Sequence, residues 1–143
     1  MNKKILTAAI SMCLAFPAFA AEPATISGRM DRVDQVVYGE VKDGSLLDRI
    51  SSVDNLIYGK GNMTGDGLDD RVSNAYLDVV NSGNDAAPSI SARTNALEYY
   101  LTDEVKREAL ADRIGNLEKT VFGKEKTGAI DQRSAELEKL SLI

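Results

Sequence analysis

The amino-acid sequence predicts an all-α fold of six short helices, arranged as a small solenoid or helical bundle. Three observations support this prediction: an arginine recurs every 20 to 22 residues, apolar residues surround it at helical spacing, and capping residues bound several of the resulting segments. The recurring arginines are Arg29, Arg49, Arg71, Arg93, Arg113 and Arg133. The repeat occupies residues 21–143, which we therefore expect to form a single helical-repeat domain.

The apolar positions of the repeat predict helices rather than strands. One aliphatic residue stands three positions before each arginine, and others stand one, four and eight positions after it in most copies. This spacing of i, i+4, i+7 and i+11 places an apolar stripe along one face of an α-helix, whereas a strand would need a period of two. The residues at the first stripe position are Ile26, Leu46, Leu68, Ile90, Leu110 and Ile130. Each copy is therefore expected to be a helix of about thirteen residues that buries its stripe against its neighbours.

Capping residues mark the ends of several of these helices. A side-chain oxygen before the stripe can accept hydrogen bonds from free backbone N–H groups, and a glycine after it accommodates the left-handed conformation that ends many helices. The N-terminal candidates are Thr25, Ser45 and Ser89, and the C-terminal ones are Gly39, Gly59 and Gly123. The residues before these glycines are Tyr38, Tyr58 and Phe122. We expect each aromatic ring to fold over the helix end and pack against the next repeat; the alternative is a platform for a sugar or a peptide.

The third and fourth copies depart from the pattern. The third ends at Asn81 without a glycine or an aromatic residue, and the segment 81–89 is expected to be the largest loop. The fourth continues into the fifth without a glycine or proline. Thr102 and the two acids after it are interpreted as a cap and an acidic first turn, so a new helix is expected to begin there and to continue to Phe122. The alternative is one helix over 90–122.

In five of the six copies, the arginine and an acid five positions later lie on opposite flanks of the apolar stripe. These acids are Asp34, Asp54, Glu98, Glu118 and Glu138. We expect the helices to be antiparallel neighbours, with the arginine of one copy paired to the acid of another in exposed ion pairs that contribute about 0 to 1 kcal/mol each. The alternative is a ladder of arginines that binds an anionic polymer of the cell envelope.

One segment carries a resemblance to known proteins. The phrase RIGNLEKTVFG, residues 113–123, resembles the short repeats of the form R-[IL]-x-x-L-E-x-x-V-F-G found in exported, poorly characterised proteins of several bacterial lineages. The pattern is sharpest in copies one, two and five and more degenerate elsewhere. The resemblance implies a secreted helical-repeat protein, and it brings no catalytic residues with it.

Residues 1–20 have the features of a cleaved bacterial signal peptide. Lys3 and Lys4 precede an apolar run, and the small-x-small sequence at 18–20 is typical of a signal-peptidase site. A lipoprotein anchored at Cys13 is disfavoured because Met12 stands where a small residue is required. No later segment approaches the roughly 18 apolar residues of a membrane span. The protein is therefore expected to be periplasmic or secreted, without an integral membrane span.

Composition argues against several classes of function. Without Lys3 and Lys4, 15 basic residues face 22 acidic ones, a net charge of about −7, which disfavours nucleic acid and anionic lipid as partners. The chain has no His and no Trp, and its single Cys falls within residues 1–20. Disulfides, imidazole metal sites and His-assisted catalytic triads are therefore not expected. We expect neither an enzyme nor a bound cofactor.

The segment 62–70 resembles a calcium-binding loop at first sight. Aligning it with the opening positions of an EF-hand places Ser73 where the bidentate glutamate belongs, so no EF-hand is predicted. A loose surface cation site remains as the alternative.

The ends of the repeat array are apolar, whereas repeat arrays normally carry polar caps. The last four residues, LSLI, are expected to dock on the first repeats or on another copy of the chain. The sequence therefore predicts a non-catalytic interaction or assembly protein of the envelope or cell surface, with a protein partner or with itself. The alternative is a periplasmic chaperone-like or binding protein that holds extended clients.

Overall fold

The computed structural model describes residues 21–83 and 87–141. Its helices are α2 (Ile26–Tyr38), α3 (Leu46–Tyr58), α4 (Leu68–Ala75), the π-helix η1 (Tyr76–Val80), α5 (Ile90–Thr102), α6 (Leu110–Phe122) and α7 (Ile130–Ser141). No strand occurs in these two ranges, so the prediction of an all-α fold of six short helices is confirmed. The predicted signal segment and the last two residues of LSLI lie outside the described residues.

The predicted N-terminal caps are confirmed. The side-chain oxygens of Thr25, Ser45 and Ser89 each accept a hydrogen bond from the backbone N–H three residues later, at 3.0, 3.1 and 3.3 Å. Gly39 and Gly123 take the left-handed conformation after α2 and α6, with φ of 79° and 78°. Helix bounds therefore follow the repeat closely.

The boundary between the fourth and fifth copies differs from both expectations. Helix α5 ends at Thr102, and the chain is not helical again until Leu110, so neither a new helix from Thr102 nor a continuous helix over 90–122 forms. Asp103 adopts the left-handed conformation, with φ of 61°, and its N–H donates to the carbonyl of Tyr99 at 3.0 Å. Aspartate tolerates this conformation better than most residues, so Asp103 ends the helix as glycine does elsewhere.

The helical segment of the third copy is as long as the others, but it changes from an α-helix to a π-helix along its length. Helix α4 passes directly into η1, and the N–H of Asn81 donates to the carbonyl of Tyr76 at 3.0 Å, five residues back. That spacing defines a π-helical turn. The loop 81–89 is as long as the loop 59–67 and longer than the other loops between helices, so it is one of the two largest and not the single largest.

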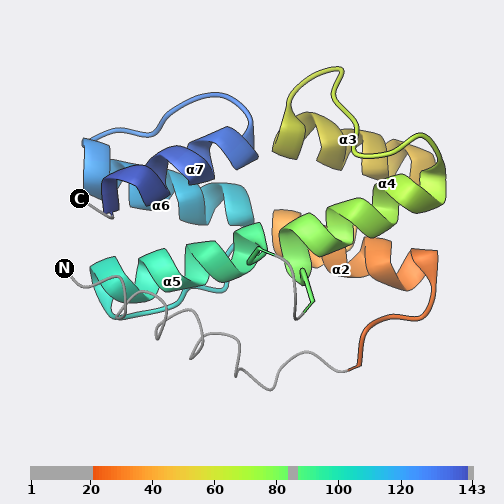
Figure 1. Ribbon diagram of the computed structural model, residues 1–143, viewed down its shortest axis with the longest axis horizontal. Coiled ribbons are helices and arrows are strands. Elements are labelled where there is room, and N and C mark those ends of the chain that lie inside the picture. The colour runs from red at the N-terminus through yellow and green to blue at the C-terminus, as the bar shows by residue number, and fades with distance from the viewer. Residues whose placement is uncertain (1–20, 84–86, 142–143) are drawn as a thin grey trace.

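The helices form two groups of three, and within each group they run parallel (Figure 1). The first trio consists of α2, α3 and α4 with η1, and the second of α5, α6 and α7; each helix contacts the other two of its trio. The expectation of antiparallel neighbours is wrong. Within each trio the connection instead returns along the helix it follows, as shown by the N–H of Lys42 in the loop 39–45, which donates to Oδ2 of Asp34 at 2.9 Å.

The two trios stack end to end, with C-terminal helix ends of the first trio against N-terminal ends of the second (Figure 1). A Cβ atom added to Gly59, after α3, would lie 3.7 Å from Cβ of Ala129, just before α7. At the end of η1 the carbonyl of Val80 accepts a hydrogen bond of 3.1 Å from the hydroxyl of Ser89, the cap of α5. Helix α2 likewise contacts α6. The C-terminal end of each helix in the first trio therefore lies against the N-terminal end of one helix in the second trio.

The apolar stripe forms one continuous core through both trios. Met30, Ile50, Leu110, Ile114 and Leu137 are completely buried in it. Burial of one such side chain contributes about 1.5 to 3 kcal/mol relative to exposure to water. Within the described ranges, no helix is long and apolar enough to cross a membrane.

Candidate functional site

Four of the six repeat arginines form buried hydrogen-bonded pairs with the acid of the preceding copy. In the second trio, Arg113 meets Glu98 and Arg133 meets Glu118 with two parallel bonds each. The Nε–Oε1 distances are both 3.0 Å, and the Nη2–Oε2 distances are 2.8 and 2.7 Å. This two-bond geometry matches the planar guanidinium to the carboxylate and fixes the direction of both side chains.

The first trio repeats this arrangement with the shorter aspartate. Arg49 donates from Nε to Oδ2 of Asp34 at 2.8 Å, and Arg71 donates from Nε to Oδ2 of Asp54 at 2.9 Å. In both ion pairs Nη2 also lies close to the same oxygen, at 2.7 and 2.8 Å. The four paired acids are at most 3% exposed, and their arginines at most 9%. The pairing of arginine with acid across copies is therefore confirmed, but the expectation that the pairs are exposed is wrong.

Three of these arginines also contact a second residue of the preceding copy. That residue stands two positions after the arginine of the preceding copy. Arg49 also reaches Asp31, Arg71 reaches Ser51, and Arg113 reaches Asn95. In the fifth copy this position is Gly115, and the free space is filled by Glu125, which accepts a bond from Arg133 at 3.4 Å. The sequence signal for these partners was the polar residue two places after the arginine, which the helical stripe alone does not single out.

The remaining two arginines close each trio into a ring. Arg29, on the first copy, donates to Oγ of Ser73 on the third at 2.9 Å. Arg93, on the fourth copy, donates to Oε1 of Glu138 on the sixth at 2.7 Å. Both arginines are more exposed than the other four, so these closing contacts are the weaker ones.

Backbone N–H groups of the returning loops also bind the buried acids. Lys42, Lys106 and Lys126 each donate their N–H to the acid eight residues earlier, at 2.9 Å in all three cases. Burial of Glu118 by itself raises its carboxyl pKa. The hydrogen bonds from Arg133 and from the Lys126 N–H outweigh this effect and hold the pKa of Glu118 below its ordinary value. These lysines were not singled out from the sequence, although they occupy the same place in three loops.

Asp54 lacks such a loop contact. Its Oδ1 is buried without a hydrogen-bond partner, and the loop after α3 instead places the side chain of Asn62 on the carbonyl of Tyr58 at 2.8 Å. Burial raises the pKa of Asp54 above its ordinary value, although the bond from Arg71 acts in the opposite direction. The repeated pair is thus supported least at this copy.

The aromatic residues at the helix ends pack against the core and hold the loops. The Nζ of Lys42 lies 5.2 Å from the ring centre of Tyr38, and the Nζ of Lys126 lies 4.0 Å from that of Phe122. These distances allow a cation–π interaction. The same lysine therefore binds the buried acid through its N–H and the aromatic ring through its ammonium group.

Tyr58 contacts the next copy directly. Its hydroxyl donates to Oδ2 of Asp78 on η1 at 2.7 Å, and burial together with this bond raises the pKa of Tyr58. Tyr58 therefore packs against the next repeat as expected from the sequence.

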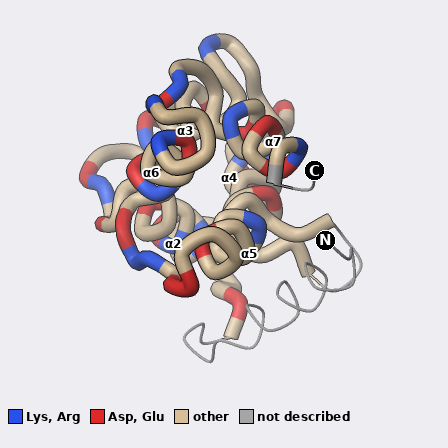
Figure 2. The backbone as a smooth tube through the Cα atoms, turned by 90° about the vertical axis from the view of Figure 1, so that its left-hand side faces the viewer, with Lys and Arg blue, Asp and Glu red and all other residues tan. Residues whose placement is uncertain are grey.

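The surface outside these contacts is mixed in charge. Figure 2, viewed along the long axis, shows Lys and Arg interspersed with Asp and Glu around both trios. Four of the six repeat arginines are buried within the trios and do not form an exposed ladder. In the described part of the chain, including the segment 62–70, no three His, Cys, Asp or Glu side chains lie close enough to hold a metal ion.

The two ends of the molecule expose positions that are buried at the junction of the trios. Leu110 and Ile130 occupy the first stripe position, at the start of α6 and α7. Both are fully buried, because the first trio covers them. At the start of the first trio the same position is only half-buried in Ile26 and Leu46, and Leu68 is 36% exposed. We call this end, formed by the first turns of α2, α3 and α4, the N-face.

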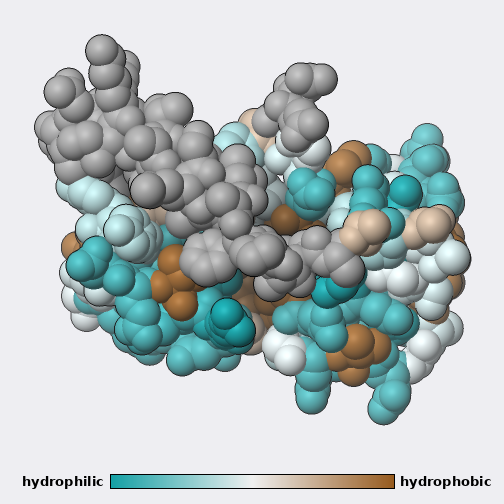
Figure 3. All heavy atoms as spheres, turned by 90° about the horizontal axis from the view of Figure 1, so that it is seen from below, coloured by the Kyte–Doolittle hydropathy of each residue, from teal (hydrophilic) through white to brown (hydrophobic). Residues whose placement is uncertain are grey.

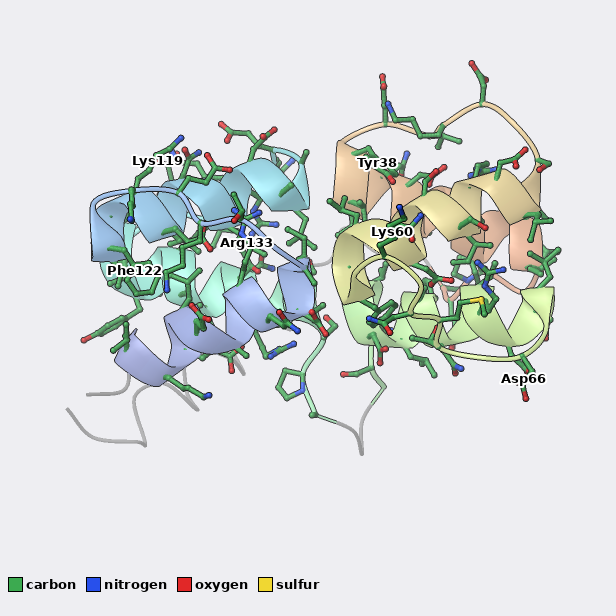
Figure 4. All side chains as sticks on the ribbon, turned by 90° about the horizontal axis from the view of Figure 1, so that it is seen from above. Tyr38, Lys60, Asp66, Lys119, Phe122 and Arg133 are labelled. Carbon is green, nitrogen blue, oxygen red and sulfur yellow. The ribbon has the colours of Figure 1, made fainter. Side chains whose placement is uncertain are left out.

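The opposite end shows the reverse contrast. Eight positions after the arginine, Val37, Ile57 and Val79 are buried against the second trio. The corresponding Leu101 and Val121, at the ends of α5 and α6, are half-buried. We call this end, formed by the last turns of α5, α6 and α7, the C-face; Figure 4 shows Phe122 and Lys119 there and Asp66 toward the opposite end of the molecule.

The chain matches no protein-family model, and neither the curated proteins nor the solved structures searched contain a match to it.

Proposed function

We propose that the protein is a non-catalytic interaction or assembly protein of the bacterial envelope or cell surface. One observation carries this proposal: the N-face and the C-face present stripe positions that the junction between the trios buries completely. Apolar residues in such positions contribute to stability only when another surface covers them. Export rests on the signal-type sequence at residues 1–20.

The arrangement of the charged groups supports a structural role for them. The buried carboxylates and guanidinium groups are paired with one another across helices, and the loops add backbone N–H donors to three of the acids. Groups held in this way fix the geometry of the trios, and the surfaces that remain for a partner are the exposed side chains of the ends and flanks.

Site-specific photocrosslinking in the native envelope tests the proposal. A photoreactive residue replaces Leu68 on the N-face in one variant and Lys60 in the other; Lys60 is exposed and lies on the side of the first trio nearest the second (Figure 4). We expect discrete crosslinked products of defined mass from position 68 and none from position 60. Cell fractionation of the same cultures should find the protein beyond the inner membrane. Equal and diffuse crosslinking from both positions, or a cytoplasmic protein, would contradict the proposal.

A second candidate function is the holding of extended clients. Tyr99 and Tyr100, in the last turn of α5, are 46% and 39% exposed, and exposed aromatic rings bind apolar segments of extended chains. A client-holding protein should suppress the aggregation of a chemically unfolded test protein, and a Tyr99→Ser, Tyr100→Ser variant should lose this effect. Suppression that is equal in the variant would remove the observation that favours this candidate.

A further inference from the structure

We propose that copies of this chain associate head to tail, with the N-face of one copy docked on the C-face of the next. The proposal rests on the assembly function above and specifies the partner as a second copy. It follows from the way the two trios already meet inside one molecule.

The junction between the trios is an interface of this kind within a single chain. Helices of the first trio end where helices of the second begin, as at Gly59 and Ala129. Both sets of stripe residues are buried there, among them Ile57 at the end of α3 and Ile130 at the start of α7. Because both trios are built from the same repeat, the second trio ends in a surface related to the end of the first. The first trio likewise begins in a surface related to the start of the second.

The outer faces retain the apolar residues that such a junction uses. Ile26, Leu46 and Leu68 lie on the N-face at the stripe position that Ile90 and Leu110 occupy in the junction. Leu101 and Val121 lie on the C-face at the position that Val37, Ile57 and Val79 occupy there. Docking of one copy on another would continue the core across the boundary between molecules. Seen from below, other hydrophobic side chains form small patches between hydrophilic ones (Figure 3).

Two of the three helices on each face also carry exposed charges, which are opposite in sign between the faces. Exposed acids occupy the first turns of the N-face, Asp48 on α3 and Asp69 and Asp70 on α4. Exposed lysines occupy the last turns of the C-face, Lys119 on α6 and Lys139 on α7. The last turns of α2 and α3, which are already covered in the junction, contain no basic residue. Opposite charges on the two outer faces favour contact between unlike faces and oppose contact between like faces.

A dimer formed by contact between an N-face and a C-face leaves one N-face and one C-face uncovered. One copy that docks through its C-face still presents a free N-face, so further copies can add in the same direction. The expected product is a linear series of copies whose mean length increases with protein concentration.

Charge reversal on each face provides the test. Sedimentation velocity of the exported protein, over a wide concentration range, is compared for the native chain and two variants. One variant carries Asp69→Lys and Asp70→Lys, and the other carries Lys119→Glu and Lys139→Glu. We expect each variant alone to associate roughly tenfold more weakly than the native chain or worse, because like charges then face each other. A chain with all four substitutions should recover association, since its faces are again complementary.

Control variants separate this effect from loss of folding. All four substituted residues are exposed, and far-ultraviolet circular dichroism should show unchanged helix content. Lys60→Glu reverses a charge outside both faces and should leave association unchanged. A native chain that stays monomeric throughout, or two face variants that associate as the native chain does, would overturn the head-to-tail proposal. If Leu68 nevertheless crosslinks to a different envelope protein, the proposed assembly function stands without it.

Discussion

Glu118 and Arg133 are joined by two parallel hydrogen bonds across adjacent helices, and the carboxylate is completely buried. The equivalent acid of the last copy, Glu138, pairs with Arg93 through a single guanidinium nitrogen and is 30% exposed at its side chain. Two acids at the same place in the repeat therefore occupy different environments, and they form a matched pair for mutation.

Glu118→Gln should destabilise the protein strongly, by about 3 kcal/mol, because it leaves the buried Arg133 with only the exposed Glu125 carboxylate, at 3.4 Å, as counter-charge. Glu138→Gln should cost about 1 kcal/mol or less, because water can solvate Arg93 once the partner is neutral. Urea unfolding followed by circular dichroism measures both free energies. Equal losses in the two variants would mean that burial does not decide the contribution of the pair.

Stability should also fall on acidification through Glu118. Its folded pKa lies below the ordinary value of 4.5, so the unfolded chain takes up the proton first as the pH falls. The stabilisation is therefore complete above about pH 5 and is lost progressively as the pH falls through 4.5 toward the lowered folded pKa. Urea midpoints measured from pH 7 to pH 3 should fall less steeply in Glu118→Gln than in the native chain.

Asp54→Asn provides the opposite comparison in the same titration. Burial raises the folded pKa of Asp54, so this group favours proton uptake by the folded state and opposes the acid loss. Its replacement should make the loss of stability on acidification steeper. A shallower loss would contradict the assignment of opposite environments to the two acids.

Leu117→Asp should largely unfold the protein, because the side chain is 3% exposed and a carboxylate there has no partner to offset its desolvation. Leu77→Asp is the matched control: Leu77 is 42% exposed, so its substitution should cost about 0.5 kcal/mol or less. Thermal unfolding followed by circular dichroism compares the two. A Leu117→Asp variant that melts like the native chain would show that the stripe is not interior.

Ser89→Ala should cost more than Ser45→Ala, although both residues cap a helix. Each accepts a backbone N–H, but the Ser89 hydroxyl also donates across the junction to the carbonyl of Val80 and is buried. We expect losses of about 2 kcal/mol for Ser89 and about 1 kcal/mol for Ser45. Urea unfolding measures the difference, and a larger loss at Ser45 would argue against the junction contact.

The sequence predicted the helices and the pairing of arginine with acid because both are properties of a single repeat. The stripe, the caps at Thr25, Ser45 and Ser89, and the position of arginine and acid on opposite flanks follow from helical spacing alone. The end of α5 was missed because a glycine was expected there. The signal was nevertheless present, since Asp103 stands ten residues after Arg93, as Gly39 stands ten residues after Arg29.

The direction of the helices and the burial of the pairs are properties of the assembly of several repeats. An arginine on one flank of a helix can meet an acid on the opposite flank of its neighbour whether the two helices run parallel or antiparallel. The apolar stripe therefore could not predict the relative direction of the helices. The informative residues lay in the loops: Lys42, Lys106 and Lys126 occupy one place, four residues after the last residue of the helix. A loop residue that repeats in this way indicates a fixed path back along the helix, which a simple turn between antiparallel helices does not require.

The common direction of all six helices gives the molecule an electrical polarity. Peptide dipoles in antiparallel bundles largely cancel, whereas here those of each trio add, and the opposite partial charges at the junction offset one another. What remains is about half a positive charge per helix at the N-face and about half a negative charge per helix at the C-face. The three acids of the first turns and the two lysines of the last turns carry more charge than these helix ends and oppose it. The dipole moment along the long axis is therefore the difference between the peptide and side-chain contributions, and transient electric birefringence can measure it.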